Sequence, residues 1–347
     1  MISYSSKIIN GFNVLKSLYA IKFFKKRIPV FCEWELTNFC NMSCQFCSTY
    51  SNDRNEANDI SEDRANEILD QLEEMGTLII HFSGGEPTLW EGFSRLIRRA
   101  KDKNIIVSFT TNGSASKKIM ESLTEADIIR VSIDGPERLH DSGRGSGAFA
   151  KAIESVRFLK DCGASPLITT VYKDDTTRQD LEDLAMLASD LGVQISLNVA
   201  TKNLYSGAGE IGFIKAEGGN SLHSDFIDTI DEVRLKHGEI FANPEPYLSI
   251  IKLGGLQNYG CRAMDVSISI KPDGSLCLPC TGLAKLTSKK NLREVFFSPE
   301  AEELLDLQGK DDVCIPCTIR CMSSASALLN IREQFSTFDS YSRSFFK

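Results

Sequence analysis

The stretch "FCEWELTNFCNMSCQFC", residues 31–47, joins a β-strand pattern directly to a loop that contains three cysteines. Residues 31–37 are rich in aromatic and apolar side chains and have the length of a strand. Cys40, Cys44 and Cys47 follow at C-x3-C-x2-C spacing, with no fourth ligand close in sequence. A structural zinc site has four ligands, whereas three thiols suit an iron–sulfur cluster that leaves one iron open. We therefore expect a cluster-binding loop at the end of this strand.

Strand and helix patterns alternate along the chain after this stretch. Runs with strand character lie at 31–37, 77–83, 104–110, 127–133, 166–172 and 193–199. Amphipathic helical patterns separate these runs. Six β–α units in succession predict a parallel sheet with right-handed crossovers, either in an open doubly wound sheet or in an incomplete β/α barrel.

The positions of the polar and glycine-rich signals favour the barrel. They follow five of the strands, as the cysteine loop, "GGEPT" (84–88), "TNG" (111–113), "DGP" (134–136) and Asn198. Barrel enzymes assemble their sites at the carboxyl ends of their strands. We predict the α/β class, with a partial (β/α)6 TIM-like barrel whose mouth carries the functional site.

Composition limits the kinds of partner that the chain binds. It has 347 residues and a net charge of -8, which argues against a nucleic-acid surface because such a surface needs clustered Lys and Arg. No secretory signal pattern opens the sequence, so a cytoplasmic location with reduced thiols is expected. Two of the eleven cysteines, Cys32 and Cys162, stand apart from the others and are predicted to be small buried hydrophobic residues.

The motifs as a set resemble those of the radical S-adenosylmethionine (SAM) enzymes. "CNMSCQFC" (40–47) is followed in order by "SGGEPTL" (83–89), "TTNGS" (110–114), "VSIDGP" (131–136) and "HDSGRGSGAF" (140–149). The resemblance covers about residues 31–200. It implies that three cysteines hold a [4Fe–4S] cluster whose open iron binds SAM. Reductive cleavage of SAM then gives a 5'-deoxyadenosyl radical that abstracts a substrate hydrogen.

The same resemblance assigns expected roles to the first half of the site. Phe46 would lie beside the adenine. Gly84 and Gly85 would let the backbone approach the methionine moiety closely, and Glu86 would receive its ammonium group. Taken alone, the two glycines fit an ordinary turn better than a binding role.

The second half of the expected site follows the later strands. Ser132 and Asp134 fall where the family contacts the ribose or the methionine end of SAM. Arg144 matches an arginine that meets the SAM carboxylate, and Asn198 matches a polar residue at the end of the sixth strand. Taken alone, Arg144 fits a solvated loop residue, and only its place at the barrel mouth favours a role in binding.

A second cysteine group resembles the carboxyl-terminal extension called SPASM, or its shorter relative, twitch. Its members are Cys261, Cys277, Cys280, Cys314, Cys317 and Cys321. We predict one auxiliary [4Fe–4S] cluster held by Cys261, one of Cys277 and Cys280, and two of the last three. The alternatives are a zinc knuckle of Cys277, Cys280, Cys314 and Cys317, and two incompletely ligated clusters.

The predicted organisation has five parts. They are an amphipathic helical segment (1–30), the barrel core (31–220), a helical linker (221–259), the auxiliary region (260–330) and a tail (331–347). Within residues 7–27, the side chains of Ile8, Phe12, Leu15, Tyr19 and Phe23 share one helical face. We favour a helix that closes the lower end of the barrel with this face, and the alternative is a basic helix at a membrane surface.

The predicted function is that of a radical SAM oxidoreductase or bond-forming enzyme. An auxiliary cluster would assist an oxidation or the formation of a C–C or C–S bond. The substrate would be a peptide or protein, a lipid or a small metabolite, and the reductant a flavodoxin or ferredoxin. The alternatives are a non-catalytic iron–sulfur electron carrier and a zinc-knuckle binding protein. The sequence identifies no acid or base for the substrate.

Overall fold

The computed structural model describes residues 4–44, 46–47, 59–173, 176–199, 221–252, 256, 260–281, 283–310, 314, 317, 326–327 and 329. Cys321 and the predicted tail 331–347 lie outside the described residues.

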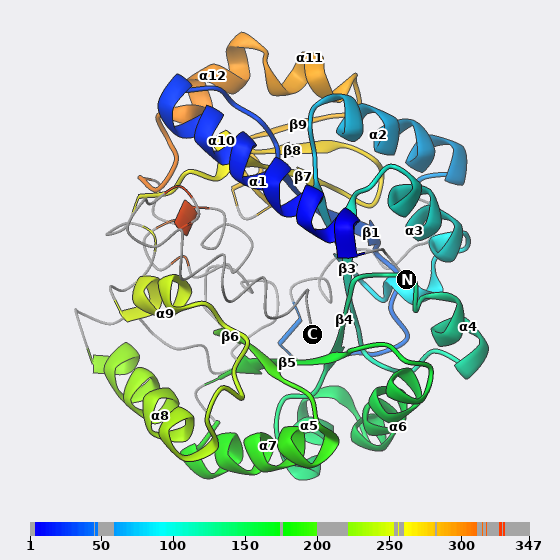
Figure 1. Ribbon diagram of the computed structural model, residues 1–347, viewed down its shortest axis with the longest axis vertical. Coiled ribbons are helices and arrows are strands. Elements are labelled where there is room, and N and C mark those ends of the chain that lie inside the picture. Colours follow the sequence, from blue (N-terminus) through cyan, green and yellow to red (C-terminus); the bar gives the residue numbers. More distant parts are fainter. Residues whose placement is uncertain are drawn as a thin grey trace.

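Six parallel strands form the barrel part of the fold (Figure 1). They are β1 (Phe31–Thr37), β2 (Ile79–Gly84), β3 (Ile106–Thr111), β4 (Ile128–Ser132), β5 (Leu167–Tyr172) and β6 (Ile195–Val199). Each pairs in parallel with the strand before it in sequence. All six predicted strands are present, within two residues at either end. The prediction of an α/β partial barrel is therefore confirmed.

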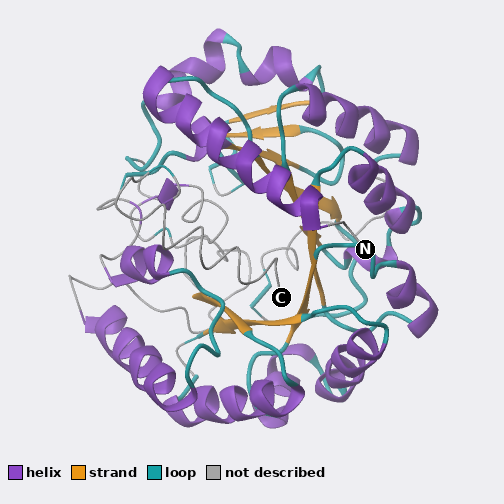
Figure 2. Ribbon diagram, in the orientation of Figure 1, coloured by secondary structure: helices purple, strands orange, loops and turns teal. Residues whose placement is uncertain are grey.

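Helices lie around the outer side of the curved sheet (Figure 2). They are α2 (Glu62–Glu74), α3 (Phe93–Asp102), α4 (Lys117–Ser122), α5 (Glu137–Arg144), α6 (Ala148–Asp161), α7 (Arg178–Leu191), α8 (Ser221–His237) and α9 (Glu245–Lys252), with a short 3-10 turn, η3 (Pro87–Leu89). Alternate residues of β1 point toward this layer. Cys32, Trp34 and Leu36 are fully buried, whereas Glu33 and Glu35 face the inner side of the sheet and are half-buried.

The cysteine-rich extension continues the same sheet. It consists of α10 (Ala263–Val266), β7 (Ser267–Ile270), β8 (Leu276–Leu278), β9 (Leu286–Ser288), α11 (Leu292–Phe296) and α12 (Pro299–Leu305). Strand β7 pairs in parallel with β1, and β8 and β9 continue antiparallel. Helices α11 and α12 are separate because Ser298 caps a new helix at Pro299, a residue that favours a first helical turn. The domain limits given above stay predictions.

The amino-terminal helix α1 (Tyr4–Phe24) packs through a different face from the expected one. Val14, Leu18 and Ile21 are buried in a cluster with Val30, Val266 and Leu329. The predicted face is exposed instead, at Phe12, Leu15, Tyr19 and Phe23. The helix is apolar on both sides, so the sequence pattern alone did not identify the buried face. None of the helices in the described part of the chain is long and apolar enough to cross a membrane.

The two isolated cysteines differ in burial. Cys32 is fully buried in the core, as predicted. The prediction for Cys162 is wrong, because this residue is exposed at the carboxyl-terminal end of α6, where the helix stops before Gly163. Apolar neighbours in the sequence did not indicate its environment, because they lie on the other face of the helix.

Candidate functional site

The cysteine loop begins directly after β1 and is tied down by short-range hydrogen bonds. The backbone N–H of Asn38 donates to Asp59 Oδ1 at 3.2 Å, and the N–H of Met42 donates to Cys40 Sγ at 3.4 Å. The N–H of Cys47 donates to the carbonyl of Cys44 at 3.2 Å. These bonds hold the described part of the loop at the carboxyl end of the strand.

The three thiols of this loop lie close enough to affect one another. Burial raises the pKa of the Cys44 thiol to about 11, against the lowering effect of Arg144, and the thiols of Cys47 and Cys40 raise this pKa too. Several thiolates this close together repel, so a bound metal charge would stabilise their ionised form. The grouping predicted for Cys40, Cys44 and Cys47 is thus present in the fold.

Gly84 and Gly85 dock the end of β2 onto the backbone that leads into the cysteine loop. A Cβ atom on Gly85 would lie 2.0 Å from the carbonyl oxygen of Phe39, and one on Gly84 would lie 2.5 Å from that of Thr37. The N–H of Gly85 donates to Thr37 O at 2.6 Å. The close approach that these glycines allow in the structure is therefore between two segments of the chain itself.

The carboxylate of Glu86 is buried and accepts four hydrogen bonds. Thr88 Oγ1 lies 2.6 Å and Thr111 Oγ1 2.7 Å from Oε1, which also accepts from the N–H of Thr88. The N–H of Asn112 donates to Oε2 at 2.7 Å. Burial outweighs these bonds and raises the pKa of Glu86. Glu86 thereby ties the end of β2 to the end of β3, and its expected contact with an ammonium group stays a prediction.

Asn112 connects this anchor to the cysteine loop. Its Nδ2 donates to Asn41 Oδ1 at 2.9 Å and lies 3.9 Å from Cys40 Sγ. Sequence analysis placed the "TNG" motif at the barrel mouth but gave Asn112 no role. The structure shows it holding the loop against the end of β3.

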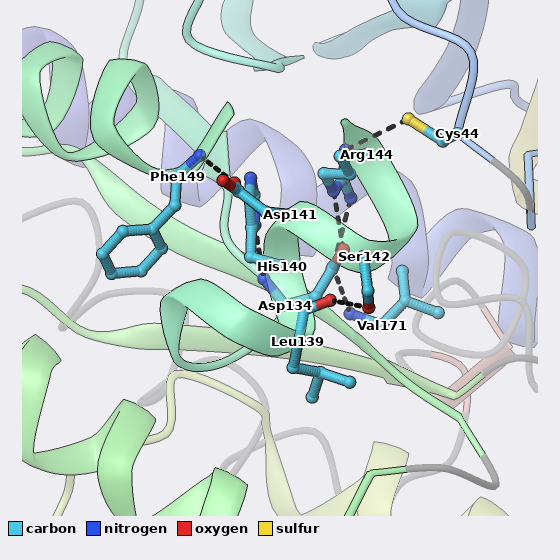
Figure 3. A network of polar contacts seen from close by, with 9 residues as sticks. All are labelled: Cys44, Asp134, Leu139, His140, Asp141, Ser142, Arg144, Phe149 and Val171. Carbon is cyan, nitrogen blue, oxygen red and sulfur yellow. Dashed lines mark hydrogen bonds and ion pairs between the residues drawn. The ribbon is translucent and has the colours of Figure 1, made fainter. Parts of the chain in front are cut away.

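Arg144 and Asp134 form a buried two-point ion pair beside the thiols (Figure 3). Arg144 Nε lies 2.6 Å from Asp134 Oδ2 and Nη2 lies 3.1 Å from Oδ1. The third nitrogen, Nη1, lies 4.0 Å from Cys44 Sγ. Burial alone would raise the pKa of Asp134, but the guanidinium of Arg144 outweighs burial and holds this pKa below its usual value. The pair places a fixed positive charge next to the cysteine loop.

The segment around Arg144 has its own internal supports (Figure 3). The backbone N–H of Asp134 donates to His140 Nδ1 at 3.2 Å, so this nitrogen must be unprotonated. Burial lowers the pKa of His140 to about 4, which keeps the ring neutral at pH 7. Asp141 accepts from the N–H groups of Gly147 and Phe149 at the start of α6, at 2.7 and 2.8 Å. His140 and Asp141 were not among the predicted site residues.

Phe46 lies close to two cations, one at the end of helix α5 and the other directly after strand β5. Its ring centroid is 5.2 Å from Arg144 Cζ and 4.8 Å from Lys173 Nζ. Lys173 follows β5 directly and is 4 % exposed. The sequence does not indicate a role for Lys173, because a single polar residue after a strand is indistinguishable from a turn residue. The expected place of Phe46 beside an adenine stays a prediction.

A pocket of about 400 Å³ opens beside the cysteine loop. The loop forms one wall through Asn41, Met42 and Ser43, and Arg144 and Lys151 contribute positive charge to the other. Two predicted residues lie elsewhere in the barrel. Ser132 is buried at the end of β4, and Asn198 Nδ2 donates to Thr169 Oγ1 at 3.1 Å on β5. Neither of them lines the pocket beside the cysteine loop.

The inner side of the sheet is polar, in contrast to the apolar layers that usually fill a closed barrel. Ser83 Oγ donates to Glu33 Oε1 at 2.5 Å, and Lys271 Nζ lies 3.3 Å from Glu35 Oε2. Burial raises the pKa of Glu33 to about 7, although the hydrogen bond from Ser83 lowers it. The raised pKa of this carboxyl could not be found from the sequence, where Glu33 looks like one more polar residue in a strand.

Histidine and arginine side chains continue the polar wall on β2 to β4. His81 lies opposite Glu33 on one side and Ser108 on the other. Its Nδ1 is 2.8 Å from Ser108 Oγ and 3.3 Å from Arg130 Nη1. The lumen therefore holds acidic, basic and neutral hydrogen-bonding groups below the mouth.

The second cysteine group is also assembled in part. Burial raises the pKa of Cys261 to about 11, and Cys280 and Cys314 are close enough to raise it too. Cys317 packs in one apolar cluster with Cys261 and Cys280. Cys277 Sγ donates to the carbonyl of Cys280 at 3.4 Å. Five of the six predicted cysteines thus lie together, and the sixth, Cys321, is outside the described residues.

Both groups suit iron–sulfur ligation. Each supplies several thiols from a confined region, and the first has an N–H donor aimed at Cys40 Sγ, a contact that stabilises a charged sulfur. No three His, Cys, Asp or Glu side chains converge as ligands of a single metal ion among the described residues. The fit therefore rests on thiol grouping and donor placement rather than on a preformed coordination geometry.

Comparison with known proteins agrees with this chemistry. Residues 34–188 match the model of the Radical SAM superfamily. The chain is 28% identical over 173 residues to the mycofactocin maturase MftC of Mycolicibacterium smegmatis, covering 49% of this chain and 44% of that protein. It is 32% identical over 165 residues to an AdoMet-dependent heme synthase of Oleidesulfovibrio alaskensis, covering 46% and 42%. The matched region spans less than half the length of these relatives.

Solved structures share the fold at lower identity. SuiB of Streptococcus suis, bound to S-adenosylmethionine, has a TM-score of 0.66 at 19% identity, covering 94% of this chain and 79% of that one. The anSMEcpe protein with bound AdoMet has a TM-score of 0.63 at 18% identity, covering 92% and 93%. These likenesses extend over the extension as well as the barrel. Residues 34–188 of the chain, which include the three-thiol loop and most of the partial barrel, are thus similar to the radical SAM superfamily.

Proposed function

We propose that the chain is a radical SAM enzyme that modifies a peptide. With a [4Fe–4S] cluster and SAM bound, the site would supply a 5'-deoxyadenosyl radical that abstracts a substrate hydrogen. The reaction would end in an oxidation or in a C–C or C–S bond. The observation that carries the proposal is the convergence of the cysteine loop, the buried Arg144–Asp134 pair and Asn112 at one barrel mouth.

Each side chain at this mouth has a definite task in the proposal. Cys40, Cys44 and Cys47 would hold the cluster. Arg144 would offer its positive charge to the carboxylate of SAM and to the nearby thiolates, while Asp134 fixes the plane of the guanidinium. An electron carrier would not need such a pre-oriented cation at the edge of a pocket, so this pair favours the enzyme over the carrier.

The second cysteine group would hold an auxiliary cluster. We propose Cys261, Cys280, Cys314 and Cys317 as its ligands, since these four lie together. Such a group would receive an electron from a substrate-centred radical, so that SAM cleavage accompanies a net oxidation. The role of Cys277 is then to support Cys280 through its hydrogen bond.

A peptide is the substrate class that the relatives and the lumen favour. SuiB has been solved with its precursor peptide SuiA, and anSMEcpe with the Cp18Cys peptide. The lumen walls present carboxyl, imidazole and guanidinium groups, which match the N–H and C=O groups of a peptide. We further propose that the reductant is a flavodoxin or ferredoxin. The enzyme would be cytoplasmic and would contact a membrane surface through residues 7–27.

Anaerobic reconstitution tests the enzyme proposal directly. We expect about four iron atoms per chain at each site and 5'-deoxyadenosine from SAM with a strong reductant. Cys44→Ala should lose the product and the iron of the first site. Cys162→Ala is the matched control, because Cys162 is exposed and distant in sequence from both groups. An intact cluster that forms no 5'-deoxyadenosine would refute the proposal.

A further inference from the structure

Helix α1 has two apolar faces, and only one of them is buried in the described part of the chain. Val14, Leu18 and Ile21 are buried against the barrel. Partly buried Leu78 and Ile79, at the start of β2, pack against the same cluster. The helix therefore covers the amino-terminal ends of the strands, opposite the mouth, and crosses in front of β7 and β1 in Figure 1.

The outward face of α1 is an ordered aromatic surface. Phe12 is 68 % exposed, Tyr19 56 %, Phe23 55 % and Phe24 66 %. The ring centroids of Tyr19 and Phe23 lie 4.5 Å apart, and those of Tyr19 and Phe24 lie 6.0 Å apart. With Leu15, five of the ten large apolar side chains exposed in the described residues belong to this one helix. Such a contiguous patch indicates a contact surface.

The charged residues within the amino-terminal segment itself have one sign, although Arg27 after the helix pairs with Glu302 of α12. Lys16, Lys25 and Lys26 are exposed at the border of the outward face, and residues 1–32 contain six Lys or Arg and no Asp or Glu. The whole chain has a net charge of -8, so the segment is a local positive region on an acidic protein. Aromatic side chains flanked by lysines are typical of helices that lie in the interface of an anionic bilayer.

We propose that α1 docks the enzyme on the surface of an anionic membrane. Phe12, Tyr19 and Phe23 would insert between the lipids, while the bordering lysines would pair with lipid phosphates. A second copy of this chain fits the face less well, because a two-fold contact would bring the lysines of both copies together. The proposal rests on the peripheral contact included in the proposed function and adds its lipid class and its contact residues.

This docking would orient the site away from the lipid. The helix covers the amino-terminal ends of the strands, and the cysteine loop lies at their carboxyl ends. A strand of seven residues spans about 23 Å, so the mouth would open to water on the far side of the barrel. A substrate dissolved in water reaches such a mouth, whereas a bilayer lipid does not. The orientation thus agrees with a peptide substrate.

Co-sedimentation of the reconstituted full chain with vesicles tests the proposal. We expect binding to vesicles of equal parts phosphatidylglycerol and phosphatidylcholine, and at least tenfold weaker binding to pure phosphatidylcholine. The triple variants Phe12→Ser/Tyr19→Ser/Phe23→Ser and Lys16→Gln/Lys25→Gln/Lys26→Gln should each lose at least tenfold. Met186→Ser/Leu235→Ser, which removes exposed apolar groups on α7 and α8, should bind like the unaltered chain.

Two results would overturn the docking proposal. One is equal binding of the unaltered chain and the aromatic variant to anionic vesicles. The other is a dimer in solution that dissociates in the aromatic variant, which would make the face a contact between copies. Formation of 5'-deoxyadenosine without vesicles is measured separately for every variant. An unaltered chain that forms product but does not bind anionic vesicles would reject docking alone, and an unaltered chain that binds vesicles but forms no product would reject the enzyme proposal alone.

Discussion

The guanidinium of Arg144 connects Asp134 to the cysteine loop, with Nε 2.6 Å from Oδ2 of Asp134 and Nη1 4.0 Å from Cys44 Sγ. The aspartate follows β4 and the arginine ends α5, so the pair joins two elements behind the loop. A buried carboxylate and a buried guanidinium each need the other, because either one alone would leave an uncompensated charge.

Replacement of one partner should therefore destabilise the chain more than replacement of both. We expect Asp134→Asn to lower the free energy of unfolding by about 3 kcal/mol, since it leaves the charge of Arg144 unpaired. Asp134→Asn/Arg144→Gln should recover most of this loss while forming no 5'-deoxyadenosine. Denaturant unfolding and product assays measure the two effects. A double variant as unstable as the single one would contradict this account.

Replacement of Glu86 tests whether its carboxylate supports the fold or binds SAM. Glu86→Gln places an amide NH2 among four donors, so we expect lower thermal stability and reduced iron loading even without SAM. A contact with the SAM ammonium alone would raise the KM for SAM and leave stability unchanged. Glu91→Gln, at an exposed position nearby, is the control for loss of one charge. Thermal unfolding without SAM separates the two outcomes.

Gly85 should tolerate no side chain, because its Cβ would overlap the carbonyl of Phe39. We expect Gly85→Ala to displace the cysteine loop and to yield protein with little iron at the first site. Gly163→Ala is the comparison, since it strains a left-handed backbone (φ 80°) but meets no neighbour. That variant should cost about 1 kcal/mol and keep its iron. Iron content and unfolding midpoints, measured for both variants, test this expectation.

The raised pKa of Glu33 predicts that the free energy of unfolding depends on pH. Its pKa of about 7 in the folded chain exceeds the usual value for a glutamate, so folding favours the protonated form. The resulting stabilisation is complete below about pH 4.5 and is lost as the pH rises to about 7, by at most about 3 kcal/mol. Glu33→Gln should reduce the change in the free energy of unfolding between about pH 4.5 and pH 7. Glu67→Gln, at an exposed position, should leave this change as it is. Unfolding measured at pH 5 and pH 8 provides the check.

The sequence was sufficient to predict those elements whose local residue pattern is compatible with only one kind of structure. Short apolar runs located every barrel strand, and Ser61, a residue type common at helix starts, caps α2 by accepting from the N–H of Arg64. The position of the cysteine loop followed from the strand before it. These features depend on neighbours within a few residues, which a sequence displays directly.

Features that depend on distant side chains were not predictable in this way. Lys173 and His140 acquire their roles only when β5 and α5 fold beside Phe46 and Asp134. Helix α1 presents two apolar faces, and only the position of Val30 and Val266 selects the buried one. Likewise, Glu86 looks like a ligand in the sequence, whereas the fold surrounds it with hydroxyl and amide donors.

The parallel pairing of β7 with β1 makes the cysteine-rich extension part of the barrel wall. Without residues 260–288, strand β1 would have unpaired N–H and C=O groups along one side, and it is the strand that carries the cysteine loop. An unprotected strand edge attracts other chains. Truncations that aim to isolate the radical SAM domain should therefore aggregate, and homologous extensions can be exchanged only if the incoming strand matches the register of β1.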